Sequence, residues 1–246
     1  MMLLSYANNF YGYGYGYRGL YFDPTMILAL LGLILTMIAS AGVNSTFAKY
    51  NRVRCMRGMT GAEAAQQVLH AAGIYDVQIR HVSGKLTDHY DPRNKTLNLS
   101  DSTFSSNSVA AVCVAAHECG HAVQDQKKYG PLVLRSTLVP LANFGSQLSW
   151  PVFVIGLIFS LQPLVMAGII LFSLAVLFQL VTLPVEFNAS SRALRILEDT
   201  GMLGAQEMTG AKKVLRAAAM TYVAALASSM LQLLRLILLS RRNDRD

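Results

Sequence analysis

The chain has 246 residues, of which 53% are hydrophobic and only 14% are charged, and its formal net charge at pH 7 is +7. Such a chain is too apolar and too poor in charge for an ordinary soluble domain, so the composition indicates a membrane protein. The cations cluster beside apolar runs, and no nucleic-acid recognition motif accompanies them. This pattern argues against nucleic acid as a partner.

The first membrane segment follows a tyrosine- and glycine-rich N-terminus over residues 1–23, which we expect to be flexible. Residues 26–47 are uncharged and numerous enough to cross a bilayer core of about 30 Å, so we predict a transmembrane helix over residues 24–47. Basic side chains, beginning with Lys49, follow this helix. The N-terminus is therefore expected outside the cell and the loop over residues 48–135 in the cytoplasm.

This loop is expected to form a small zinc-peptidase domain. Thr60 and Glu63 have the spacing of a capping box, which predicts a short helix that stops at Gly73. Three strands are predicted, over residues 77–82, 86–90 and 96–99, with a turn at 91–94 that makes the last two a β-hairpin. An exposed strand beside a peptidase site could pair with an extended substrate, although plain structural packing explains such a strand equally well.

The most informative motif is His117-Glu118-Cys119-Gly120-His121. Residues four apart share one face of a helix, so His117 and His121 can bind the same zinc ion. Glu118 stands one step around the helix, where it can act as general base towards the water that zinc activates. The pattern is typical of a zinc hydrolase.

The helix that carries this motif is predicted over about residues 106–126, with Ser105 or Ser106 as its N-cap. Gly120 would weaken a helix interior, but it removes bulk beside the site and could let a substrate chain or another segment approach closely. Cys119 points about 200° away from His117, so we expect it to be a packing residue and not a ligand. With three cysteines in the chain, no disulfide framework is expected.

Apolar segments dominate the second half of the chain. Residues 136–185 contain no charged side chain, and Gln162-Pro163 marks a break, so we predict a hairpin of two transmembrane helices. A later hydrophobic helix is interrupted by Arg235 and by polar residues, so it could span, pack inside the bundle or lie at the interface. The remaining segments are residues 186–216, which carry the third candidate ligand, the hydrophobic helix at 217–240 and a basic tail at 241–246.

A catalytic zinc site needs a third protein ligand besides the two histidines. Glu186 is the best candidate, because an unpaired charge at the end of a membrane helix would be costly. The alternative is a surface glutamate in the first turn of a helix, where the helix dipole favours it. His89 is the rival: in the hairpin it could be a ligand, a transition-state donor or an ordinary exposed histidine.

Four separated segments carry a resemblance to a known family. They are residues 58–61 (GMTG), 86–92 (LTDHYDP), 117–124 (HECGHAVQ) and 183–190 (LPVEFNAS). In this order they resemble the bacterial membrane-bound neutral zinc metallopeptidases of the YugP-like family. The resemblance implies a gluzincin-type site that faces the cytosol, with His117 and His121 as ligands, Glu118 as general base and Glu186 as third ligand.

One position departs from a related pattern. The HtpX-like membrane peptidases usually have an aspartate four residues after the glutamate, where this chain has Ser190. Asn188 or Asn143 could support a ligand histidine instead. The donor that stabilises the oxyanion is left open among Tyr90, His89 and Arg192.

We therefore expect a mainly α-helical membrane protein, with three to four transmembrane helices and a small zincin-like α+β cytosolic domain in which a β-hairpin precedes the motif helix. The expected function is a zinc-dependent endopeptidase of the bacterial cell membrane, with one zinc ion and its active site on the cytoplasmic side. Its expected partners are protein or peptide substrates, including membrane-associated ones, and the lipid bilayer. The alternative function is a non-catalytic membrane adaptor with a structural zinc, which would leave Glu118 without a role.

Overall fold

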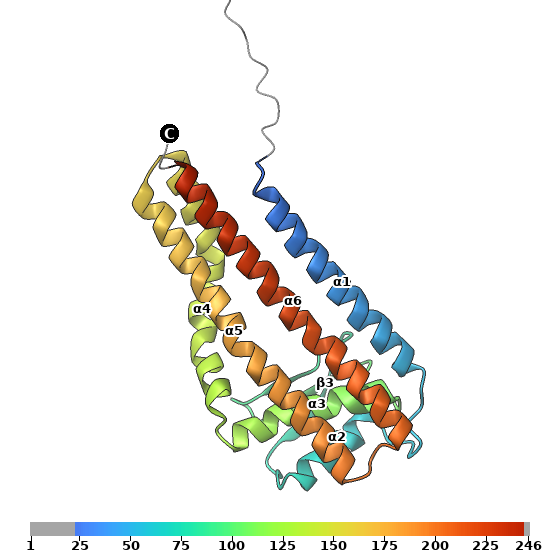
Figure 1. Ribbon diagram of the computed structural model, residues 1–246. Helices are drawn as coiled ribbons and strands as arrows, with labels where there is room; N and C mark the ends of the chain where they lie inside the picture. Colours follow the sequence, from blue (N-terminus) through green and yellow to red (C-terminus); the bar gives the residue numbers. More distant parts are fainter. Residues whose placement is uncertain (1–22, 244–246) are drawn as a thin grey trace, which may run out of the picture.

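The computed structural model describes residues 23–243, so the tyrosine- and glycine-rich N-terminus and the last three residues lie outside the described part of the chain. Four long helices form a bundle, and two shorter helices and a small sheet gather at one end of it (Figure 1). The prediction of a mainly α-helical protein with a small sheet before the motif helix is confirmed. The elements are α1 (Met26–Asn51), α2 (Gly61–Ala71), β1 (Gln78–Val82), β2 (His89–Asp91), β3 (Thr96–Ser100), α3 (Val109–Gln126), α4 (Gly130–Ile158), α5 (Gln162–Asp199) and α6 (Ala205–Asn243).

Four of these helices, α1, α4, α5 and α6, are long and apolar enough to cross a membrane. Their apolar side chains are exposed on the outside of the bundle, as at Ile34 and Ile38 of α1, and hydrocarbon is the environment that suits such a surface. The start of α1 and the end of α6 lie together, opposite α2, α3 and the sheet (Figure 1). The chain is therefore a membrane protein that carries its small folded unit at one end of the bundle.

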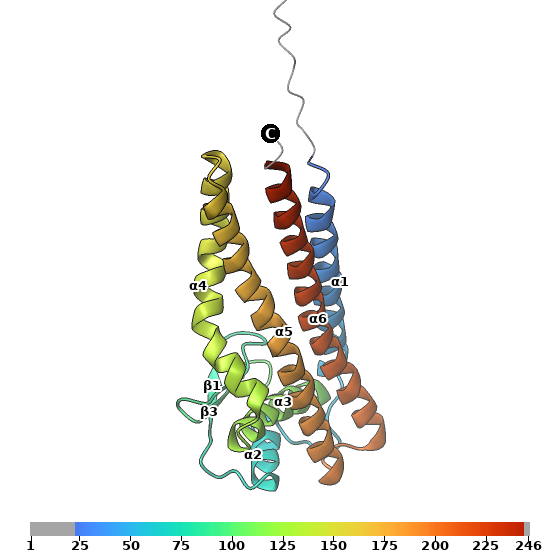
Figure 2. The ribbon, with the colours of Figure 1, turned by 60° about the vertical axis from the view of Figure 1, so that its left-hand side comes forward.

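The membrane helices associate as two pairs, α4 with α5 and α1 with α6, and α5 also packs against α6 (Figure 2). The predicted break at Gln162-Pro163 is confirmed, because α4 ends at Ile158 and α5 begins at Gln162. A methyl group at Gly156 would overlap the backbone of Val165, so these two helices meet with little side chain between them. Close backbone approach at small residues is a common way for membrane helices to pack.

Helix α6 contains the last hydrophobic segment and packs within the bundle. It begins at Ala205, earlier than expected, runs beside α1 and packs against α5 (Figure 1). The guanidinium of Arg235 lies 3.7 Å from a carboxylate oxygen of Asp23 near the start of α1. A charged residue in an apolar helix is thus paired inside the bundle, and α6 counts as a fourth candidate span.

The sheet has the strand order β1-β3-β2, with β1 parallel and β2 antiparallel to the central strand β3. Leu97 and Leu99 of β3 are fully buried. Strand β2 is shorter than predicted and begins at His89, because Leu86 has a φ of +57°, which is incompatible with an extended strand. Strands β2 and β3 still form the predicted hairpin, and β2 is a short strand at the edge of the sheet.

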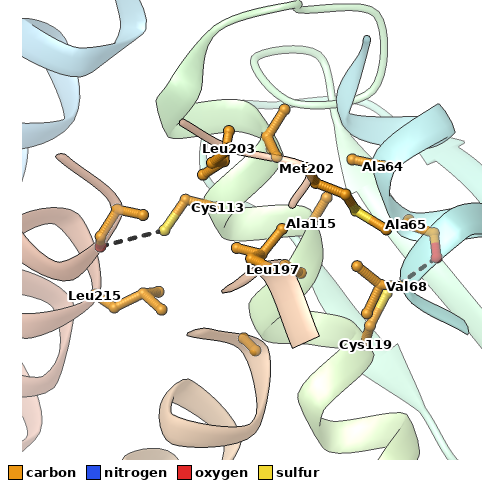
Figure 3. Packing of buried hydrophobic residues seen from close by; sticks show 14 of the residues in the cluster. Ala64, Ala65, Val68, Cys113, Ala115, Cys119, Leu197, Met202, Leu203 and Leu215 are labelled. Carbon is orange, nitrogen blue, oxygen red and sulfur yellow. Dashed lines mark hydrogen bonds between the residues drawn. The ribbon is translucent and has the colours of Figure 1, made fainter. Parts of the chain in front are cut away.

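Helix α3 lies in the centre of the folded unit, with α2 on one side and α5 and α6 on the other (Figure 3). Its N-cap is Ser108, whose hydroxyl accepts a hydrogen bond from the Ala111 amide, and not Ser105 or Ser106 as predicted. The chain up to Ser108 is held extended by backbone hydrogen bonds, including one from Cys55 to the Asn107 carbonyl and one from Val109 to Val53. The helix cannot begin before these contacts end.

Candidate metal centre

Three side chains that the sequence had singled out come together where α3 meets α5. Each of His117, His121 and Glu186 offers one ligand atom, and these three atoms all lie within 4.8 Å of one another. One carboxylate oxygen of Glu186, Oε2, lies 3.3 Å from Nε2 of His117 and 3.6 Å from Nε2 of His121. The glutamate is only 2% exposed and stands in the middle of α5, so the alternative of a surface glutamate in the first turn of a helix is wrong.

The close crossing of the two helices depends on Gly120. A methyl group at this position would overlap the carbonyl oxygen of Ala189 on α5. The expectation that Gly120 lets another segment approach closely is confirmed, and the segment is the helix that carries Glu186. The crossing places a carboxylate from one helix opposite two imidazoles from the other.

The outer nitrogen of His121 is held by a defined hydrogen bond. Its Nδ1 lies 3.0 Å from Oε1 of Gln124, a fully buried side chain. The amide nitrogen of Gln124 donates to the Val185 carbonyl at 2.8 Å, and a carbonyl can only accept, so Gln124 must present its oxygen to His121. His121 therefore carries its proton on Nδ1, which leaves the lone pair of Nε2 facing Glu186. This is the arrangement that orients a metal-binding histidine.

The outer nitrogen of His117 contacts Ser190, at 3.1 Å from the hydroxyl oxygen. A serine hydroxyl can accept the N–H bond that an aspartate would accept at this position. Asn188 instead contacts Gln124 and Arg192. Asn143 is exposed on α4, so it is Ser190 itself that supports the histidine.

Two further residues at the site come from the membrane helices and were missed by the sequence reasoning. Nη1 of Arg135 on α4 lies 3.2 Å from Oε1 of Glu186, and the hydroxyl of Tyr222 on α6 interacts with the same carboxylate. Arg135 is the one charged residue in α4, which is a recognisable signal in an apolar helix. Nothing in the sequence around Tyr222 distinguishes it.

The electrostatics of this group favour a positive charge at its centre. Burial by itself lowers the pKa of His121, but the hydrogen bond to Glu186 and the charges of Glu118 and Glu186 outweigh it and raise the pKa overall. A site that stabilises an added positive charge is suited to a metal dication. The donor set of two imidazoles and one carboxylate is also a set that zinc accepts, so the residues fit a zinc ion.

Cys119 takes no part in this group, as predicted. Its thiol points towards α2, where it contacts the Ala65 carbonyl at 3.5 Å (Figure 3). Burial, together with the charge of Glu118, raises the pKa of this thiol well above its usual value. A neutral thiol that faces the core is a packing residue.

The side chain of Glu118 extends from α3 to the edge strand β2. It is 9% exposed, and its Oε2 accepts a hydrogen bond from the backbone N–H of Tyr90 at 3.1 Å. The carboxylate is therefore next to the histidines but outside the group of three converging ligand atoms. A carboxylate in this position remains available for proton transfer.

The side chains of the other candidate residues make their hydrogen bonds elsewhere. Nδ1 of His89 contacts the Thr87 carbonyl at 2.9 Å, and its Nε2 contacts Asn98 at 3.1 Å. The hydroxyl of Tyr90 donates to Asp125 at 2.8 Å, and burial together with this bond raises the pKa of Tyr90 above its usual range. The guanidinium of Arg192 binds Asn188 at 2.7 Å and lies over the ring of Tyr129.

The fold and the site together define a helical membrane protein with a group of two histidines and one glutamate that is suited to a metal ion. Residues 25–241 match the model of a family described as "Putative neutral zinc metallopeptidase", and the chain belongs to this family. It is 46% identical over 221 residues to the "Putative membrane protease YugP" of Bacillus subtilis (strain 168), and the match covers 90% of this chain and 98% of that protein. No solved structure matches. The resemblance found in the sequence is confirmed, and the family implies zinc as the cofactor.

Proposed function

We propose that the protein is a zinc-dependent endopeptidase of the membrane in which His117, His121 and Glu186 hold the zinc ion. The observation that carries this proposal is the group of three converging ligand atoms, in which His121 and Glu186 are buried and His117 is partly buried. The hydrogen bonds that Ser190 and Gln124 make with the outer histidine nitrogens support it, because they turn both inner nitrogens towards the carboxylate.

Glu118 is the proposed general base. When bound, zinc acidifies a water molecule and polarises the peptide carbonyl. The Glu118 carboxylate takes the proton that this water gives up as it attacks the carbonyl carbon, and then passes the same proton to the nitrogen of the departing amine. The hydrogen bond from the Tyr90 amide holds the carboxylate beside the histidines in the resting state.

We assign the role of oxyanion donor to Tyr222, because its hydroxyl interacts with Glu186. The side chains of His89, Tyr90 and Arg192, which the sequence had suggested, are engaged with other partners. Arg135 has a positioning role, since its guanidinium holds the outer oxygen of Glu186 and leaves Oε2 directed at the histidines.

The proposed substrate is an extended segment of an unfolded or membrane-tethered protein. Strand β2 pairs with β3 along one side only, and on its other side the Tyr90 amide faces Glu118. A peptide that adds to this free edge would bring its backbone next to the base. Structural packing alone also explains the presence of β2. The argument for peptide pairing is therefore the position of β2 beside Glu118.

The site is proposed to face the cytoplasm. Lys49 lies in the last turn of α1 and Arg52 is its C-cap, and this end of α1 lies at the same end of the bundle as α3 (Figure 1). Cationic residues favour the cytoplasmic side of membrane segments. Arg241 lies at the opposite end, where four spans would place it outside. More basic residues lie around the folded unit than at the Arg241 end, and this difference favours a cytoplasmic position for the folded unit.

The proposal is tested with the purified full-length protein in detergent. We expect about one zinc per chain and cleavage of an unfolded protein such as casein, and we expect Glu118→Gln to keep the zinc but lose the cleavage, because the base is not a ligand. Chelation should abolish wild-type cleavage and zinc should restore it. Undiminished cleavage by Glu118→Gln would refute the hydrolase. The alternative, an adaptor with a structural zinc, predicts zinc without any cleavage by the wild type.

A further inference from the structure

Two hollows flank α6 near the end of the bundle that carries the folded unit. The first, of about 380 Å³, lies between α1 and α6, and its lining includes Lys49, Lys213 and Arg216. The second, of about 540 Å³, lies between α5 and α6, and its lining includes Arg195, Lys212 and again Arg216. Five cations from three helices thus converge around one stretch of α6, and Arg216 belongs to both hollows.

In the described part of the chain, these five cations outnumber the acidic residues that line the hollows. Glu198 is the single acidic residue that lines either hollow. Among residues 23–243, no ion pair includes any of the five cations. Like charges gathered in a concave surface repel one another, so an anion that enters the hollows is favoured.

The hollows also have an apolar side that faces the membrane spans. Met220, one turn beyond Arg216, lines the first hollow, and Phe187 lines the second. Both side chains are close to half exposed. Lys49 is the first charged residue after the uncharged run of α1. The cations therefore stand at the boundary of the apolar spans, where lipid phosphates meet acyl chains.

We propose that these two hollows bind the headgroup of an anionic phospholipid, with its phosphate among the cations and its acyl chains along the apolar side. Basic pockets between membrane helices are a known mode of recognising anionic headgroups. The combination of unpaired cations and exposed apolar side chains distinguishes this ligand from a free anion, which would gain nothing from Met220 or Phe187. The proposal does not depend on the proposed peptidase activity.

The test uses the full-length protein in nanodiscs of phosphatidylcholine, with or without phosphatidylglycerol. We expect phosphatidylglycerol to raise the melting temperature and to remain bound after transfer to detergent, as read by native mass spectrometry. The double variant Lys213→Gln, Arg216→Gln should bind it about thirty-fold more weakly, from about 1 kcal/mol per cation. A matched control, Arg80→Gln with Lys85→Gln, removes the same charges from the exposed surface of the folded unit and should bind as the wild type does.

Three results would overturn the proposal. They are equal binding of phosphatidylglycerol by the double variant and the wild type, equal losses in both double variants, and stabilisation by inorganic phosphate alone to the same extent as by the lipid. If the double variant fails to fold, the wild-type protein is crosslinked to a photoactivatable phosphatidylglycerol and the crosslinked residues are identified. Crosslinks within residues 212–220 support the site, and crosslinks confined to other helices contradict it.

Discussion

Gln124 offers the sharpest separation of metal binding from folding. Its side chain makes three hydrogen bonds, to His121 Nδ1 at 3.0 Å, to the Val185 carbonyl at 2.8 Å and to Asn188 at 3.0 Å. Replacement by leucine, which has a similar size, removes all three bonds and leaves Nδ1 of His121 without its acceptor, whereas Asn188 keeps its bond to Arg192. At about 1 kcal/mol per bond, we expect the free energy of unfolding to fall by about 2–4 kcal/mol. Loss of the bond that orients His121 should weaken zinc binding roughly 10–100-fold.

Gln124→Glu is the matched control. A carboxylate still accepts the N–H bond of His121, but it cannot donate to the Val185 carbonyl. We therefore expect stability to fall by roughly 1–3 kcal/mol while zinc affinity stays at the wild-type level or rises. Zinc affinity is measured by competition with a chromogenic chelator, and stability by chemical denaturation of the zinc-free protein. Wild-type zinc affinity in Gln124→Leu would refute the reasoning, because His121 would then need no orienting partner.

Three further predictions concern packing, the third ligand and orientation. Gly120→Ala should separate α3 from α5, which should cost roughly 1–3 kcal/mol of stability and weaken zinc binding. The control Gly42→Ala should be nearly neutral, because Gly42 has open space around it. Equal thermal stability of the two variants would contradict the close contact at Gly120. After mild chelation Glu186→Ala should lose zinc and His89→Ala should keep it, and the opposite pattern in metal analysis would reverse the assignment. A cysteine at Asp101 in a cysteine-free background should react with an impermeant label only after the membrane is opened, and labelling of intact cells would place the site outside.

The parts of this molecule that the sequence predicts well depend on short-range patterns. The three- and four-residue spacing around His117 and His121 requires a helix, and the uncharged run of α1 requires a membrane span. Gly120 indicates a place of close approach, because a glycine weakens a helix interior and its main advantage there is the absence of a side chain. These features survive in the structure because each is determined by neighbouring residues.

The rest depends on how distant helices pack, which periodicity does not reveal. Arg135 and Tyr222 reach Glu186 from separate membrane helices, and Ser190 supports His117 only because α5 crosses α3 at Ala189. The short length of β2 follows from the backbone of Leu86, whose positive φ has no signature in a leucine. Contacts of this kind become visible only once the crossing of the helices is known.

The most direct test of the central claim is the zinc-edge X-ray absorption spectrum of the purified protein. We predict two imidazole nitrogens and one carboxylate oxygen at roughly 2.0–2.2 Å, with one further oxygen from solvent. In Glu186→Ala the carboxylate contribution should disappear together with most of the bound zinc. A sulfur neighbour at roughly 2.3 Å, or four ligands that all come from the protein, would contradict a catalytic zinc held by His117, His121 and Glu186.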